Sequence, residues 1–95
     1  YCCVHDAIRL LNAVKARGKK LLPHFLGSAP GQAASLHLAS GCGENCLMEW
    51  DVNPNPLRTT LFKEPFEIKN GVVEIPDRPG VGWHLDFEVI ERLRV

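Results

Sequence analysis

The feature that most constrains the fold of this chain is the alternation of helical and strand-like stretches in its first half. Apolar residues recur at helical spacing, at Val4, Ala7, Ile8, Leu11 and Val14. Gly18 follows at the position where a glycine commonly ends a helix. A short apolar run over residues 20–25, typical of a buried strand, comes next. The chain is therefore predicted to begin with a helix and a strand.

A second helix and a second strand are predicted immediately afterwards. Residues 27–31 are expected to form a loop, and QAASLHLAS, residues 32–40, predicts a helix rich in small residues. The run CLMEWD, residues 46–51, predicts the second strand. Because helix and strand alternate with short connections, we expect parallel strands joined by crossover helices, which is an α/β architecture.

The character of the sequence changes after the second predicted strand. NPNPLR, residues 53–58, predicts a connection broken by prolines. Alternating runs flank Asn70-Gly71, a strong signal for a β-hairpin with a type I′ turn. PDRPGVG, residues 76–82, is expected to be a rigid loop, and residues 83–95 are expected to form a short strand and a last turn of helix. The second half thus predicts a hairpin segment.

The predicted strands are too few to form a complete domain. Parallel sheets are normally covered on both faces and contain several strands, which two strands and two helices cannot supply. The chain also opens at Tyr1, and its only methionine is Met48. We therefore expect it to be part of a longer protein whose upstream strands complete the sheet.

Two polar residues close the predicted strands. His24 follows Pro23, which lacks an N–H and is tolerated only where a strand ladder ends, and Glu49 lies near the end of the second strand. The C-terminal ends of neighbouring parallel strands open on one face, so we expect the two side chains to share a cavity. A histidine and a carboxylate there can divide proton transfers, and histidine exchanges protons near neutral pH. The alternative is a histidine that is satisfied within a loop or the core.

Two further side chains are candidates for binding a substrate. Asp51 follows Glu49 by two residues, so it could contact a substrate from the same side of the strand. A cap or loop hydrogen bond is the alternative for this aspartate. Phe25 could form a wall of the pocket, and core packing is its alternative. Arg58 is expected at the surface, although it could pair with a carboxylate.

Composition and charge exclude several classes of partner. Lys+Arg and Asp+Glu both number 11, so no net charge steers the chain to nucleic acid or an anionic membrane. No apolar stretch approaches the roughly 20 residues of a membrane span. Four cysteines occur, Cys2, Cys3, Cys42 and Cys46. Reduced thiols in a cytoplasmic protein are the favoured interpretation, and a small α+β binding module with zinc on the cysteines is the alternative.

The motifs PHFLG, AASLHLAS, LMEWD, NPLR and NGVVEIPDRPGVG resemble the C-terminal end of the mandelate racemase and muconate lactonizing enzymes of the enolase superfamily. The resemblance covers essentially the whole chain. It implies a (β/α) barrel with a capping domain. Residues 1–57 then correspond to the last βα units of the barrel, and residues 58–95 to a C-terminal segment that returns to the capping domain.

The resemblance also implies a reaction. Enolase-superfamily sites use a Lys or His base with one or two Mg²⁺ ions to remove the proton α to a carboxylate. By motif, His24 is the base, and Glu49 hydrogen-bonds the substrate carboxylate. An acid-sugar dehydratase is the favoured activity, and a racemase or epimerase of 2-hydroxy acids is the alternative. The small carboxylate substrate is the expected partner, and the parent is expected to be a homo-oligomer. The resemblance places the metal ligands upstream of Tyr1, so this chain alone is expected to bind no Mg²⁺ and to be inactive.

Overall fold

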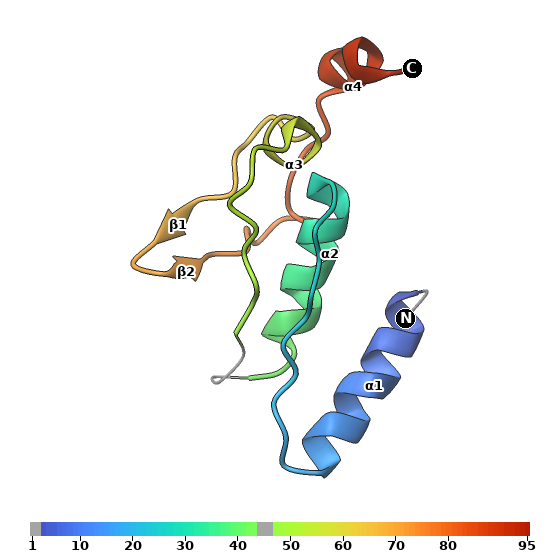
Figure 1. Ribbon diagram of the computed structural model, residues 1–95, viewed down its shortest axis with the longest axis vertical. Helices are drawn as coiled ribbons and strands as arrows, with labels where there is room; N and C mark the ends of the chain where they lie inside the picture. Colours follow the sequence, from blue (N-terminus) through green and yellow to red (C-terminus); the bar gives the residue numbers. More distant parts are fainter. Residues whose placement is uncertain (1–2, 44–46) are drawn as a thin grey trace.

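The computed structural model describes residues 3–43 and 47–95. In chain order its elements are α1 (Val4–Ala16), α2 (Ala29–Ser40), α3 (Pro56–Thr59), β1 (Ile68–Lys69), β2 (Val72–Val73) and α4 (Phe87–Leu93) (Figure 1). Helix α2 packs against both α1 and α3. In the described part of the chain, no helix is long and apolar enough to cross a membrane.

Helices and extended segments alternate in direction, as an α/β architecture requires. The segment after α1 runs back along α2 and opposite to it, and the segment that follows residue 46 again runs opposite to α2 (Figure 1). The two extended segments therefore point the same way and are separated in sequence by one helix. This is the parallel arrangement predicted from the order of the elements.

The prediction of two regular β-strands in these segments was wrong for the described residues. Residues 20–25 and 47–51 have no strand assignment, while residue 46 of the second predicted strand lies outside the described part of the chain. Within residues 3–43 and 47–95, the strand pairing consists of β1 with β2 and one isolated bridge between Phe62 and Leu85. A sheet needs several strands for stability, and two short segments beside one helix do not reach that number.

Proline chemistry explains two further differences from the sequence-based expectation. Helix α2 begins at Ala29, three residues before the predicted start, with Pro30 in its first turn. Helix α3 likewise begins with a proline, Pro56, inside the connection expected over residues 53–58. Proline suits the first turn of a helix because its fixed φ is already helical and its missing N–H would have no partner there. The chain end also differs, since residues 87–93 form two turns of helix, α4.

The predicted hairpin is confirmed. Ile68 pairs with Val73 and Lys69 with Val72 in antiparallel register, which leaves Asn70-Gly71 as a two-residue turn. Both turn residues have positive φ, 52° at Asn70 and 75° at Gly71, as a type I′ turn requires.

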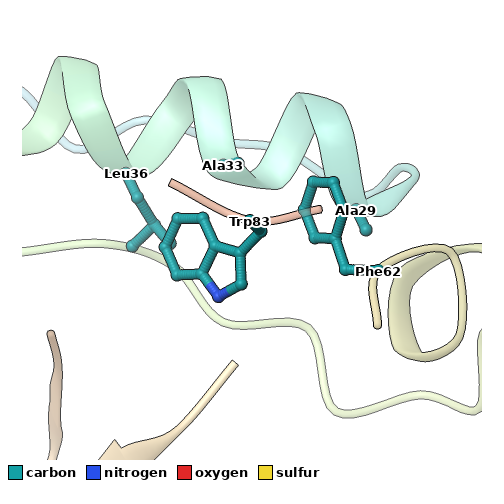
Figure 2. Close-up of a cluster of buried hydrophobic side chains, with 5 residues drawn as sticks. All are labelled: Ala29, Ala33, Leu36, Phe62 and Trp83. Atoms are coloured by element: carbon teal, nitrogen blue, oxygen red, sulfur yellow. The ribbon is translucent and has the colours of Figure 1, made fainter. Parts of the chain in front are cut away.

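The core lies between α2 and the aromatic residues of the C-terminal half. Its buried members are Ala29, Ala33, Leu36, Phe62 and Trp83 (Figure 2). The small side chains of the two alanines leave room for the rings, and Phe62 stacks on Trp83 with ring centroids 6.1 Å apart. This packing joins residues 29–36 to residues 62–83 and so fixes α2, which lies between the two segments that hold His24 and Glu49.

Candidate active site

His24 stands at the end of the first extended segment. Pro23 before it is buried, while the His24 side chain is 71% exposed. A buried proline restricts the backbone immediately before the histidine, because the ring fixes φ. The imidazole is thus held on an anchored backbone and open to solvent.

Glu49 meets His24 directly across the two extended segments. Its Oε2 lies 2.5 Å from Nδ1 of the imidazole, and 42% of the Glu49 side chain is exposed. The two residues are 25 positions apart in sequence, so the contact depends on the fold rather than on local geometry. The proximity predicted from the order of the elements is therefore present, and the catalytic roles of the two residues stay predictions.

Asp51 is engaged inside the protein. Its Oδ1 accepts hydrogen bonds from the backbone N–H and the side-chain amide of Asn53, at 2.9 and 2.7 Å. Its Oδ2 accepts from Nη1 of Arg58 at 2.6 Å, and the two side chains are only 8% and 7% exposed. The backbone N–H of Asn53 is the largest cause that holds the pKa of Asp51 below its ordinary value of 3.8, and Arg58 acts in the same direction against the effect of burial.

Asp51 and Arg58 line a cavity different from the surroundings of His24. The cavity has a volume of about 330 Å³, and aromatic side chains form part of its wall, Trp50, Phe62 and Phe66. The expectation that Arg58 lies at the surface was wrong. Sequence analysis missed this burial because the only signal is a carboxylate seven positions earlier, and nothing in that spacing indicates that both groups turn inward.

Phe25 packs on helix α2. A Cβ added to Gly27 or Gly31 would overlap the Phe25 ring, so the ring fills the space that the two glycines leave open. Phe25 also lines an apolar groove of about 590 Å³ between α1 and α2, and neither His24 nor Glu49 is among the residues that line it. The structure therefore brings Phe25 to the helices, and does not bring it or Asp51 to the His24–Glu49 pair.

The comparison with known families settles which group of proteins this geometry belongs to. A family model described as "Enolase C-terminal domain-like" matches residues 3–89. The chain belongs to the enolase C-terminal domain-like family. The match includes His24 and Glu49 together with the core around α2, and family membership favours an enzymatic parent over a small zinc-binding module.

Curated relatives of this enolase-like chain are enzymes. It is 31% identical to arabinonate dehydratase of Saccharolobus solfataricus over 91 residues, and this match covers 96% of the chain. It is 31% identical to D-galactarolactone cycloisomerase of Agrobacterium fabrum over 86 residues, a match that covers 82% of the chain. It is 36% identical to muconate cycloisomerase 1-2 of Acinetobacter lwoffii over 73 residues, a match that covers 74% of the chain. The chain spans only 24%, 23% and 18% of the length of these relatives.

A solved structure gives the same fold. The enolase-like chain superposes with a TM-score of 0.86, at 26% identity, on a protein from Bordetella bronchiseptica RB50 provisionally described as a mandelate racemase and crystallised with 2-oxoglutarate/phosphate. The match covers 94% of this chain and 24% of that one. The fold is therefore that of part of the enolase C-terminal β/α-barrel domain.

The described residues of this enolase-like chain offer no ligand set for a metal. Within residues 3–43 and 47–95, no group of three or more His, Cys, Asp or Glu side chains is arranged to hold an ion. Mg²⁺ prefers several oxygen ligands in octahedral geometry, which these residues do not bring together. Cys3 and Cys42 are free thiols, and the other two cysteines of the zinc alternative, Cys2 and Cys46, lie outside the described residues.

Proposed function

We propose that this chain supplies a histidine base and a neighbouring carboxyl group to the active site of a Mg²⁺-dependent enolase-superfamily enzyme, and that this enzyme is an acid-sugar dehydratase. The contact of 2.5 Å between His24 Nδ1 and Glu49 Oε2 is the observation on which the proposal rests. Similarity to arabinonate dehydratase over 96% of the chain supports dehydration as the reaction.

In this proposal the base is Nε2 of His24. Its other ring nitrogen, Nδ1, is occupied by the Glu49 carboxyl group, and the exposed imidazole leaves Nε2 to face a substrate. A hydrogen bond from Nδ1–H to a carboxylate orients the ring and leaves Nε2 free to accept a proton. Nε2 takes the proton from the carbon α to the substrate carboxylate, and the electron pair of the C–H bond passes into the enediolate.

Glu49 then has two tasks. Its Oε2 accepts from Nδ1–H of the imidazole, and a protonated Oε1 would donate a hydrogen bond to the carboxylate of the substrate. A protonated Glu49 would also donate to the enediolate as negative charge develops there, and stabilisation of developing charge is commonly the largest contribution to catalysis.

Dehydration completes the sequence for a 2,3-dihydroxy acid. The protonated His24 returns its proton to the hydroxyl on the β carbon, which leaves as water while the enediolate electrons form the new C=C bond. The resulting enol becomes a 2-keto acid by protonation at carbon. One histidine thus acts first as a base and then as an acid on groups attached to neighbouring carbon atoms.

The metal would be held by the rest of a full-length protein. Enolase-superfamily members typically use Mg²⁺, and its charge stabilises the enediolate when it is bound. Because the described residues of this chain provide no such site, we expect the 95-residue chain alone to be inactive. His24 and Glu49 would provide the acid–base groups of the complete site.

A racemase or epimerase of 2-hydroxy acids is the second candidate. The fold match to the protein provisionally described as a mandelate racemase, with a TM-score of 0.86, supports it. Both reactions begin with removal of the same α proton and differ in whether the β hydroxyl is lost. The experiment is to incubate a full-length protein containing this chain with acid sugars in D₂O. A 2-keto acid supports dehydration, and exchange of the α hydrogen with retention of the hydroxyl supports the second candidate. A protein that neither releases a 2-keto acid nor exchanges the α hydrogen contradicts both.

Two variants test the assigned residues in the same assay. We expect His24→Gln to lower the rate of α-hydrogen exchange by roughly 10²–10⁴-fold, the range typical of a lost general base. Glu49→Gln should lower it less, because the amide can still hydrogen-bond. His5→Gln, at an exposed position of α1, is the control and should exchange like the wild type. A His24→Gln variant with wild-type exchange would remove His24 from the mechanism.

A further inference from the structure

The two residues that follow Glu49 are both anchored in the protein. Trp50 contacts Phe66 edge to face, with ring centroids 5.5 Å apart. Asp51 is 8% exposed and accepts three hydrogen bonds, two from Asn53 and one from Arg58. Glu49 precedes these two anchored residues. Its side chain is 42% exposed and contacts His24.

Arg58 links Asp51 and Asn53 to a helix. Its Nη1 donates to Asp51 Oδ2 and its Nη2 donates to the backbone carbonyl of Asn53, both at 2.6 Å. A planar guanidinium that makes two such bonds fixes orientation as well as distance. Arg58 belongs to α3, and α3 packs against α2. The chain after Glu49 is therefore held to the helix that separates it from the segment of His24.

We propose that Asp51 and Arg58 are positioning residues that hold Glu49 against Nδ1 of His24. This inference rests on the proposed function of His24 and Glu49, and it assigns a role to two residues that need not touch the substrate. With residues 50 and 51 fixed, the backbone at Glu49 has little freedom to rotate, so its carboxyl group stays within reach of the imidazole. A misplacement of about 1 Å between catalytic groups can cost on the order of 10²-fold in rate.

Arg58→Lys is the first test, made in a full-length protein that contains this chain. Lysine keeps the charge but cannot reproduce the two-bond fork to Asp51 and Asn53. We expect kcat to fall on the order of 10²-fold and KM to change less, because Arg58 does not itself contact the substrate and acts only on the position of Glu49. Arg78→Lys is the matched control, since Arg78 pairs with Glu64 at 3.0 Å on an exposed surface. This variant should keep the wild-type kcat.

A double-mutant cycle with Glu49→Ala, which removes the hydrogen-bonding group, shows whether Arg58 acts through Glu49. If it does, Arg58→Lys should cause little further loss of kcat once Glu49 has been replaced, because coupled residues are not additive. The inference would be overturned if Arg58→Lys lowered kcat equally with and without the Glu49→Ala substitution. An unchanged kcat in folded Arg58→Lys would overturn it as well.

Two safeguards keep the test decisive. If Arg58→Lys does not fold, the double variant Asp51→Asn/Arg58→Gln leaves no uncompensated buried charge and enters the same cycle. If the wild type neither releases a 2-keto acid nor exchanges the α hydrogen, the proposed function has failed, and ¹⁵N NMR of the His24 ring then decides the positioning role alone. A change in the Nδ1 signal in Arg58→Lys but not in Arg78→Lys supports the inference, and an unchanged signal contradicts it.

Discussion

Among the short contacts between a carboxylate and a nitrogen group in the described residues, the His24–Glu49 and Arg58–Asp51 pairs differ most in their access to water. His24 lies 2.5 Å from Glu49 with both side chains substantially exposed, whereas Arg58 lies 2.6 Å from Asp51 with both buried. Water screens the exposed pair and allows a substrate to replace one partner. Burial removes that freedom from the second pair, because a separated charge would be left without solvent. Access to water, rather than distance, therefore separates a contact suited to chemistry from one suited to structure.

The largest expected effect on stability comes from breaking the buried pair. Arg58→Met leaves the Asp51 carboxylate buried without its cation, and loss of one partner of a buried pair is strongly destabilising. We expect the thermal midpoint to fall by roughly 10 °C or more. Circular dichroism melts of the variant and the wild type provide the measurement. A midpoint within about 3 °C of the wild type, on the order of a surface substitution, would contradict the structural role of this pair.

An intermediate effect is expected where Phe25 packs on helix α2. Gly31→Ala would place a methyl group in the space occupied by the Phe25 ring. We expect a loss of about 1–3 kcal/mol in the free energy of unfolding, the usual cost of overpacking. Chemical denaturation provides the value. Phe25→Leu combined with Gly31→Ala should recover part of the loss, and failure to recover any would place the strain elsewhere.

A smaller, pH-dependent effect is expected from a third cluster, around Glu64. The backbone N–H of His84 is the largest cause that lowers the pKa of Glu64 from 4.5 to about 2, with the His84 side chain and Arg78 adding to it. The contacts therefore stabilise the fold above pH 4.5, and this contribution is lost as the pH falls toward about 2.

Denaturation at several pH values tests this cluster. Glu64→Gln should flatten the decline in stability between pH 4.5 and about 2, the interval between the two pKa values of Glu64. Glu91→Gln, in α4, is the matched control because its Arg94 partner lies at an exposed position, 3.6 Å away. Identical pH profiles for Glu64→Gln and the wild type would contradict the assigned contacts.

The smallest effect on stability is expected where the effect on activity is large. Glu49→Gln changes one member of an exposed pair, and exposed pairs contribute little to stability. The thermal midpoint should stay within about 3 °C of the wild type. A much larger drop would mean that the His24–Glu49 contact is structural, and the contrast with Asp51–Arg58 would then disappear.

Local signals in the sequence predicted the parts of the fold that local chemistry determines. The apolar spacing before Gly18 predicted α1, and Asn70-Gly71 predicted the hairpin turn with its positive φ values. The meeting of His24 and Glu49 was also predictable, because it follows from the order of the elements and not from any single contact. The direction of each segment can thus be predicted from the sequence where the order of helices and strands is recognised.

Contacts that depend on packing could not be predicted from the sequence in the same way. The apolar run of residues 20–25 has the composition of a strand, yet a strand assignment needs a regular ladder within a sheet of several strands, which composition cannot supply. Arg58 was expected at the surface because arginine usually lies there, and only the folded α3 turns it onto Asp51. The same limit applies to Phe25, whose ring fills the space left by Gly27, two residues later, and by Gly31 in helix α2.

The exposure of helix α4 has a consequence for local unfolding of the protein. Asp86 caps it by accepting from the N–H groups of Glu88 and Val89, yet none of its residues is buried. Its amide hydrogens should therefore exchange with solvent by local fraying, far sooner than those of α2 around Ala33. A protease should cut first in this last helix and release the C-terminal peptide while the imidazole and carboxyl groups of the candidate site stay in place.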